Sequence, residues 1–326
     1  MTAILKFLII SLSIVIAFFV IILFLRHYAK KRLKEALIRA GYYEDWQPTD
    51  GTIHTDIIYD YTNRLSFDLY VPSKIDPDKP QGLILFIHGG SWFMGNKTHI
   101  AYAAKRYAKV GYLTASMNYS LLSKDHPQIT FQTILDNIQN CITKIKTITL
   151  EMGFNVRKIA LSGISAGGHL ALLYGYARQD QSPLPIAFLA VQTGPSDFHL
   201  ETTQHISKIA QSVFERKTGI KLSLSDYKNP DIINLIEQSS PITFIKEKSP
   251  PTLMAYGGKD NLVPARNREL MLEALSKAGV PFTDIFFPNS NHLLADDPDA
   301  RDGYHQTFLI YAQRYFDRIE YDKTLN

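Results

Sequence analysis

One serine lies in a short segment of small residues, Gly163-Ile164-Ser165-Ala166-Gly167-Gly168, between an apolar stretch and a helical pattern. A G-x-S-x-G spacing in this context is typical of a sharp strand-to-helix turn that exposes the serine hydroxyl, and its small residues let the two elements approach. The N-terminus of the following helix favours negative charge that develops nearby. The segment lacks the G-x-G-x-x-G spacing of dinucleotide sites and the Lys-Ser/Thr of phosphate loops. The pattern therefore predicts that Ser165 is a nucleophile.

A serine nucleophile needs a histidine to take its proton and a carboxylate to orient that histidine. Asp260 follows the apolar run 253–256, and His292 follows the run 283–287, so each lies just after a predicted strand. The order Ser, Asp, His is typical of one large class of serine enzymes. The sequence leaves rivals for the acid: Asp197, Asp284 and Asp296. Asp197 is the strongest rival because it also follows a predicted strand.

Backbone amides that stabilise an oxyanion are predicted in the segment His88-Gly89-Gly90-Ser91-Trp92, which follows the apolar strand Leu83–Ile87. Small residues let the backbone reach a developing negative charge. We expect the amides of Gly90, Ser91 and Ala166 to form the oxyanion hole. His88 is another candidate for the base. A histidine that precedes glycines is better explained by a structural role, in which its hydrogen bonds hold the loop.

The elements that position these residues alternate along the chain. Two amphipathic strands at the sheet edge come first, and apolar strands then alternate with helices, which predicts a mostly parallel sheet covered on both faces. The predicted strands are 53–59, 65–71, 83–87, 112–117, 159–161, 186–191, 253–256 and 283–287, and the predicted helices are 100–109, 129–148, 166–177, 265–278 and 301–319. Residues 198–244 interrupt the alternation with helical patterns, so we expect an inserted cap there.

The N-terminal segment differs from the rest of the 326-residue chain, whose formal net charge is +4. Residues 1–34 hold six basic and no acidic residues, which leaves 29 basic and 31 acidic residues in 35–326 and no basic stripe for nucleic acid. Residues 7–25 are uncharged, and a helix of that length spans roughly 28 Å, close to a bilayer core of about 30 Å. We expect a transmembrane anchor (1–25), a basic juxtamembrane helix that ends near Gly41 followed by a hinge (26–50), and a catalytic domain (51–326). Basic residues after the span predict that this domain is cytoplasmic.

Several of these stretches together resemble the α/β-hydrolase superfamily. IHGGSWFMGNK, Asn118-Tyr119, LSGISAGGHLAL, SSPITFI, PPTLMAYGGKDNLVP and NSNH are similar to the esterase branch that includes hormone-sensitive-lipase-like, feruloyl/acetyl-esterase and kynurenine-formamidase-like enzymes. The resemblance covers about residues 53–315 and implies an α/β-hydrolase fold. It implies a triad of Ser165, Asp260 and His292. Ser91 departs from the third glycine of the lipase-like branch.

The residues and the resemblance favour a membrane-anchored serine hydrolase that cleaves small carboxylic esters through an acyl-enzyme. No cofactor is expected, and the sequence has no His-x-x-x-His or H-E-x-x-H pair that would indicate a metal site. The alternatives are an amidase or formamidase, an acyltransferase on the same fold, and a membrane-tethered binding protein with a vestigial site.

Overall fold

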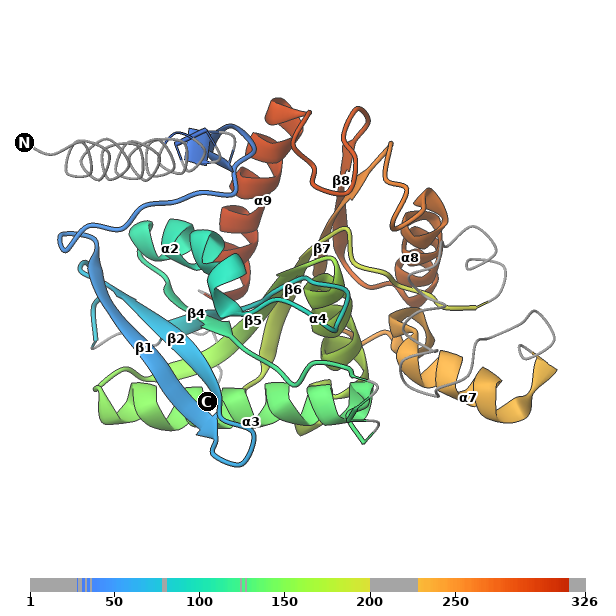
Figure 1. The fold of residues 1–326 in the computed structure, drawn as a ribbon, viewed down its shortest axis with the longest axis horizontal. Helices are drawn as coiled ribbons and strands as arrows, with labels where there is room; N and C mark the ends of the chain where they lie inside the picture. The colour runs from blue at the N-terminus through green and yellow to red at the C-terminus, as the bar shows by residue number, and fades with distance from the viewer. Residues whose placement is uncertain are drawn as a thin grey trace, which may run out of the picture. The chain divides into compact units, whose positions relative to one another are not determined.

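The computed structural model describes residues 28–316, except 29–30, 33, 36, 78–80, 124, 127 and 200–227. The chain divides into two compact units, Met1–Tyr43 and Glu44–Asn326 (Figure 1). The predicted transmembrane segment 7–25 lies outside the described residues. Within the described residues, no helix combines the length and the apolar character needed to span a bilayer.

The first unit contains the end of a helix, and its last turn is closed by glycine as predicted. Gly41 has φ +79°, and its amide donates to the Ile38 carbonyl at 3.0 Å. The amide of Tyr42 donates to the Leu37 carbonyl at 2.8 Å. This pair of bonds is a Schellman motif, in which a left-handed glycine satisfies the last helical carbonyls.

The second unit is built on one eight-stranded sheet of order β1-β2-β4-β3-β5-β6-β7-β8 (Figure 1). The strands are β1 (Gly51–Asp60), β2 (Leu65–Pro72), β3 (Gln81–Ile87), β4 (Leu113–Met117), β5 (Val156–Ile164), β6 (Ile186–Gln192), β7 (Thr252–Gly257) and β8 (Phe282–Phe287). Strand β2 pairs antiparallel with β1 and β4, and all other neighbours are parallel. The mostly parallel sheet with an antiparallel edge is therefore confirmed.

Helices cover both faces of the sheet because the strands alternate their side chains between two apolar clusters. The helices are α2 (Ala101–Lys109), α3 (Phe131–Glu151), α4 (Ala166–Ala177), α7 (Pro230–Ser239), α8 (Ala265–Ala278) and α9 (Pro298–Phe316). Leu83, Leu85 and Ile87 pack in the cluster that holds α3, α4 and α8. Ile84 and Phe86 pack in the other cluster, against α2 and α9, which Figure 1 shows on the opposite side of the sheet from α3.

Residues 198–199 and 228–244 of the predicted cap are described. They include α7 and the 3₁₀ turn η4 (Pro241–Phe244), which lie between β6 and β7 in the chain. Asn229 caps the N-terminus of α7: its side chain accepts a hydrogen bond from the Asp231 amide, and Pro230 occupies the first turn. Residues 200–227 of the predicted cap lie outside the described residues.

Candidate active site

Ser165 lies at the turn between β5 and α4, with φ +56° and ψ −124°. A non-glycine residue in this region is strained, and such strain is common at functional sites. The turn requires glycine on both sides because the backbones touch: a Cβ on Gly163 would lie 2.4 Å from the Gly167 carbonyl carbon, and a Cβ on Gly167 would lie 2.0 Å from the Ile87 carbonyl oxygen. The predicted strand–turn–helix context of Ser165 is confirmed.

His292 and Asp260 lie beside Ser165 in one hydrogen-bonded chain. The Nε2 atom of His292 is 2.8 Å from Ser165 Oγ, and its Nδ1 atom is 2.8 Å from Asp260 Oδ2. The carboxylate accepts, so Nδ1 carries the proton and Nε2 is free to accept the serine proton. The side chains of His292 and Asp260 are only 14% and 1% exposed. This arrangement can remove a proton from Ser165.

Adjacent parallel strands explain why residues distant in sequence meet here. Asp260 follows β7 and His292 follows β8, which pair in parallel, so their loops emerge at one sheet edge. The second Asp260 oxygen, Oδ1, accepts the amides of Leu262 at 2.8 Å and Val263 at 2.9 Å. These two bonds fix the carboxylate and direct Oδ2 toward His292.

None of the three rival carboxylates bonds to His292 within the described residues, and two of them have other partners. Asp197 is buried and bonds to His199. Asp284 forms an ion pair with Arg268. The backbone amide of Asp296 donates to Ser290 Oγ at 3.0 Å, and in the described part of the chain its carboxylate forms no hydrogen bond with His292. Of the four candidate acids, Asp260 is the one that the structure brings to His292.

The oxyanion segment lies against the nucleophile. A Cβ on Gly89 would lie 3.3 Å from the Ser165 Cβ. Gly90 and Ser91 have φ angles of +126° and +50°. Neither of their amides bonds to another residue of the described chain. Ala166 is the first residue of α4, where amides have no intrahelical acceptor. The structure thus places all three predicted donors on segments that adjoin Ser165.

His88 holds the oxyanion segment, as its position before the glycines predicts. Its Nδ1 atom is 2.7 Å from the Gly89 carbonyl, and its ring stacks on Tyr119 with 4.3 Å between centroids. The Tyr119 hydroxyl donates to the His88 carbonyl at 3.0 Å. Burial lowers the pKa of His88 to about 4 and keeps the ring neutral.

A buried lysine with two carboxylate partners lies just after the same segment, and sequence reasoning missed it. Lys97 is buried and bonds to Asp68 and, at 2.8 Å, to Asp56. Burial opposes the charged form of Lys97, but these carboxylates outweigh it and raise the pKa. The Lys97 amide also donates to Asn118 Oδ1 at 2.8 Å. The sequence did offer one signal for this role: Lys97 is the only lysine in the stretch from His88 to Lys97, which has no acidic residue.

Asp297 was also missed, and it braces the loop that carries His292. It accepts hydrogen bonds from the Asn289 amide at 2.9 Å and from Ser290 Oγ at 2.7 Å. The sequence did offer one signal for Asp297: it directly precedes Pro298, and proline is frequent in the first turn of a helix, here α9.

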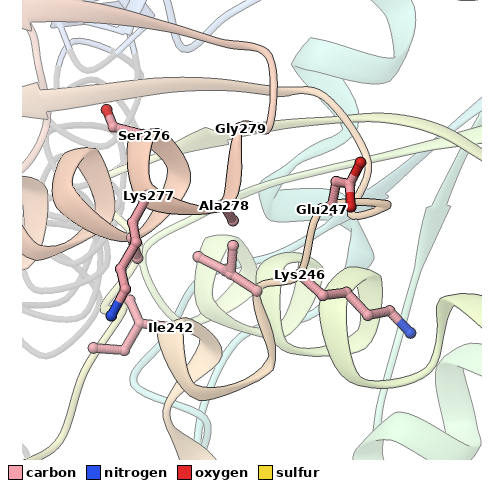
Figure 2. Close-up of a pocket in the computed structure, with 9 residues that line it drawn as sticks. Ile242, Lys246, Glu247, Ser276, Lys277, Ala278 and Gly279 are labelled. Carbon is pink, nitrogen blue, oxygen red and sulfur yellow. The ribbon is translucent and has the colours of Figure 1, made fainter.

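A separate surface pocket lies where η4 and the end of α8 meet (Figure 2). Its lining includes Ile242, Lys246, Ser276 and Lys277, and none of the nucleophile, base or acid candidates. Within the described residues there is no group of three or more His, Cys, Asp or Glu side chains that could hold a metal ion.

A family model, BD-FAE, matches residues 67–275. The chain belongs to the BD-FAE family. The match includes Ser165 and Asp260 and ends before His292. The sheet order and the helices on both faces give this family member an α/β-hydrolase fold.

Several curated relatives of this BD-FAE chain are esterases by name. A "Probable isoprenylcysteine alpha-carbonyl methylesterase ICME" from Oryza sativa subsp. japonica is 26% identical over 271 residues, covering 80% of this chain and 62% of the relative. "Esterase LipQ" from Mycobacterium tuberculosis is 23% identical over 232 residues, covering 69% of this chain and 53% of the relative. The chain thus spans only 53% to 62% of the length of these relatives.

Solved structures share the fold. "Bacterial Heroin Esterase" superposes with a TM-score of 0.66 at 21% identity, covering 88% of this chain and 90% of that one. A "Truncated form of carbohydrate esterase from gut microbiota" has a TM-score of 0.66 at 18% identity, covering 83% of this chain and 100% of that one. At these identities the likeness concerns the fold alone.

Proposed function

We propose that this protein is a serine hydrolase that cleaves carboxylic esters, with Ser165 as nucleophile, His292 as base and Asp260 as the residue that orients it. The observation that carries the proposal is the hydrogen-bonded chain Ser165–His292–Asp260, with both contacts at 2.8 Å, on a strained turn at the carboxyl edge of the sheet. The esterase names of the curated relatives support the same reaction.

The steps of the proposed reaction follow from the proton on His292 Nδ1, which leaves Nε2 able to accept the Ser165 proton. Ser165 Oγ attacks the ester carbonyl carbon while His292 Nε2 takes the serine proton, and the amides of Gly90, Ser91 and Ala166 stabilise the oxyanion. Protonated His292 then gives the proton to the departing alkoxide, which leaves as the alcohol. Water attacks the acyl-enzyme with His292 again as base, and the acid and Ser165 are released.

The apolar surface around the site supports a small ester with an apolar portion. Met94, Leu262 and Leu293 are 54%, 43% and 54% exposed, and they lie on the loops that carry the proposed oxyanion donors, acid and base. Exposed large apolar side chains next to a reactive group favour binding of apolar ligands. A series of p-nitrophenyl esters of increasing acyl length should show kcat/KM rising beyond acetate.

We also propose that the chain is anchored in a membrane by residues 7–25, with the hydrolase unit on the cytoplasmic side. The uncharged run and the basic residues that follow it support this topology. Membrane fractionation followed by alkaline extraction tests the anchor. Protease treatment of intact cells tests the orientation, because digestion of the hydrolase unit would place it outside.

Ser165→Ala tests the hydrolase proposal directly. Removing the attacking oxygen should lower kcat on p-nitrophenyl butyrate by ~10⁴-fold or more and should abolish labelling by a fluorophosphonate probe. Ser276→Ala is the matched control, because Ser276 lines the separate pocket of Figure 2. Retention of activity by Ser165→Ala would refute the assignment.

A further inference from the structure

Trp92, which directly follows the proposed oxyanion donors, has an unusual backbone conformation. Its φ is +65°, and it follows Gly90 at +126° and Ser91 at +50°. L-residues with bulky side chains rarely adopt positive φ, and they do so where surrounding contacts over-determine the conformation. The path of the oxyanion segment therefore depends on whatever holds the Trp92 side chain.

The Trp92 side chain is held by one hydrogen bond inside an aromatic cluster. Its indole Nε1 donates to His169 Nδ1 at 3.0 Å, and Trp92 is only 2% exposed. Phe131, Phe198 and His169 lie against the indole in edge-to-face geometry, with centroids 5.7, 5.9 and 5.2 Å away. The aromatic packing positions the ring, and the His169 bond fixes which way its N–H points.

His169 lies on α4 one turn after the nucleophile, and its amide donates to the Ser165 carbonyl at 2.9 Å. Its ring is fully buried, and Nε2 is 2.8 Å from the carbonyl oxygen of Ser239 at the end of α7. Because Nδ1 accepts from Trp92, the proton is on Nε2 and is donated to Ser239. Burial lowers the pKa of His169 to about 4, so the ring stays neutral and keeps its acceptor.

We propose that His169 is a positioning residue that sets the oxyanion segment through Trp92 and couples that segment to the end of α7. The proposal rests on the proposed function, since it concerns the amides of Gly90 and Ser91. Both ring nitrogens of His169 form hydrogen bonds: Nδ1 bonds to Trp92 of the oxyanion segment, and Nε2 bonds to Ser239 at the end of α7. A displacement of α7 is thereby transmitted through one rigid ring to the oxyanion donors.

Two substitutions of His169 separate its two bonds. His169→Asn keeps an amide oxygen near the position of Nδ1, where it can accept from Trp92, but it loses the bond to Ser239. His169→Gln places its amide near Nε2, where it can donate to Ser239, but it loses the bond to Trp92. A purely structural role predicts equal effects, since each variant removes one hydrogen bond from the same buried ring.

We expect His169→Gln to lower kcat by about 30-fold with KM nearly unchanged, because oxyanion stabilisation acts mainly in the transition state. His169→Asn should lower kcat by only about threefold. His305→Asn is the control: His305 is half-buried and bonded through both nitrogens, to Arg106 and Tyr107, and neither partner belongs to the oxyanion segment or to α7. It should leave kcat unchanged. Equal losses of kcat in the two His169 variants would overturn the proposal.

Trp92 fluorescence gives a readout that does not depend on turnover. The chain has two tryptophans, so Trp46→Phe leaves Trp92 as the only one. In that background His169→Gln should at least double acrylamide quenching of Trp92, while His169→Asn should leave it near the parent value. Unchanged quenching in His169→Gln would contradict the proposal.

Two further outcomes are separable. If the parent protein neither hydrolyses esters nor labels at Ser165, the proposed function fails; if it is active and His169→Gln is unimpaired, only the positioning role fails. Should a His169 variant not fold, Trp92→Phe removes the same N–H donor while keeping an aromatic ring. Trp92→Phe should lower kcat by at least tenfold, and an unchanged kcat would overturn the proposal.

Discussion

Replacing Asp260 by asparagine changes one atom of the proposed acid and tests the reasoning most sharply. Oδ1 accepts two backbone amides, those of Leu262 and Val263, and Oδ2 faces His292 Nδ1. In the variant, one of these two positions becomes an NH₂ group. The side chain is 1% exposed, so water cannot correct a mismatch.

The two amide orientations differ in cost. If NH₂ faces the two backbone amides, the buried Val263 N–H and the part-buried Leu262 N–H lose their acceptor, at about 1–3 kcal/mol each. If the oxygen keeps those bonds, NH₂ faces His292 Nδ1, which must then accept. The second orientation is therefore favoured by at least about 2 kcal/mol, which is roughly 30-fold. It places the His292 proton on Nε2, where it cannot take a proton from Ser165.

We expect Asp260→Asn to lower kcat by ~10³- to 10⁴-fold. At least 30-fold comes from the tautomer, and the rest from the lost charge beside the imidazolium. This corresponds to about 4–5.5 kcal/mol of transition-state stabilisation. The measurement is kcat and KM for p-nitrophenyl butyrate at pH 8, with thermal unfolding to confirm that the variant is folded.

Asp197→Asn is the matched control, because Asp197 is equally buried, pairs with a histidine and was the strongest sequence rival. It should retain kcat within about threefold of the parent. If Asp260→Asn keeps more than a tenth of the parent kcat while Asp197→Asn loses more, the assignment of Asp260 is wrong.

Two other predictions concern stability. Gly167→Ala should lower the free energy of unfolding by more than about 3 kcal/mol and abolish activity, because its Cβ would lie 2.0 Å from the Ile87 carbonyl oxygen. Gly303→Ala in α9 has nothing within 4 Å of its Cβ and should be neutral or stabilising by up to about 1 kcal/mol; urea unfolding of both variants checks the contrast. Burial lowers the pKa of three histidines to about 4, and these are His88, His169 and His305. Between pH 6.5 and 4 the unfolded chain binds their protons and the folded chain does not, so stability falls as the pH falls, by up to about 3 kcal/mol per histidine. Urea unfolding at pH 7 and pH 5 measures this loss, and equal stability at both values would contradict the neutral buried rings.

The sequence predicted the elements and the nucleophile turn because both depend on local patterns. The apolar run Leu83–Ile87, the spacing around Ser165 and the helix that follows are contiguous, and each has a physical meaning on its own. Element ends were less certain: the helix predicted over 129–148 is α3, Phe131–Glu151. Helix ends are set by caps, such as the Thr130 box here, and not by apolar periodicity.

Asp260 was predicted as the acid, but the sequence left Asp197 open as a rival. Asp197 and Asp260 both follow buried parallel strands, so both emerge at the same sheet edge. What separates them is spatial: β7 is next to β8, the strand before His292, whereas β6 is one strand further away. Sheet order is a long-range property, and no local pattern in the sequence encodes it.

The contacts that hold the oxyanion segment could not be predicted from the sequence, because they also join residues that are far apart along the chain. Lys97 meets Asp68, and Trp92 meets His169, across 29 and 77 residues of chain. Each residue has an ordinary explanation in isolation: a solvated lysine, a core aromatic, a helical histidine. Only their proximity in the fold gives them a part in holding the oxyanion segment.

Backbone strain in the described chain is concentrated where the proposed chemistry occurs. Seven non-glycine residues of the described chain have positive φ, and five of them lie on loops that follow parallel strands at the carboxyl edge: Ser91, Trp92, Ser165, Thr193 and Leu294. Each costs of order 1–3 kcal/mol, and turn propensity alone would place glycine there. Specific bonds to neighbouring strands and loops offset the cost: the Ser165 amide donates to the Gln192 carbonyl at the end of β6 at 2.9 Å, and the Thr193 hydroxyl donates to the His292 carbonyl in the loop after β8 at 3.3 Å. Strain held by contacts between loops orients these residues before substrate binds, so a substitution in one loop is expected to disturb the others.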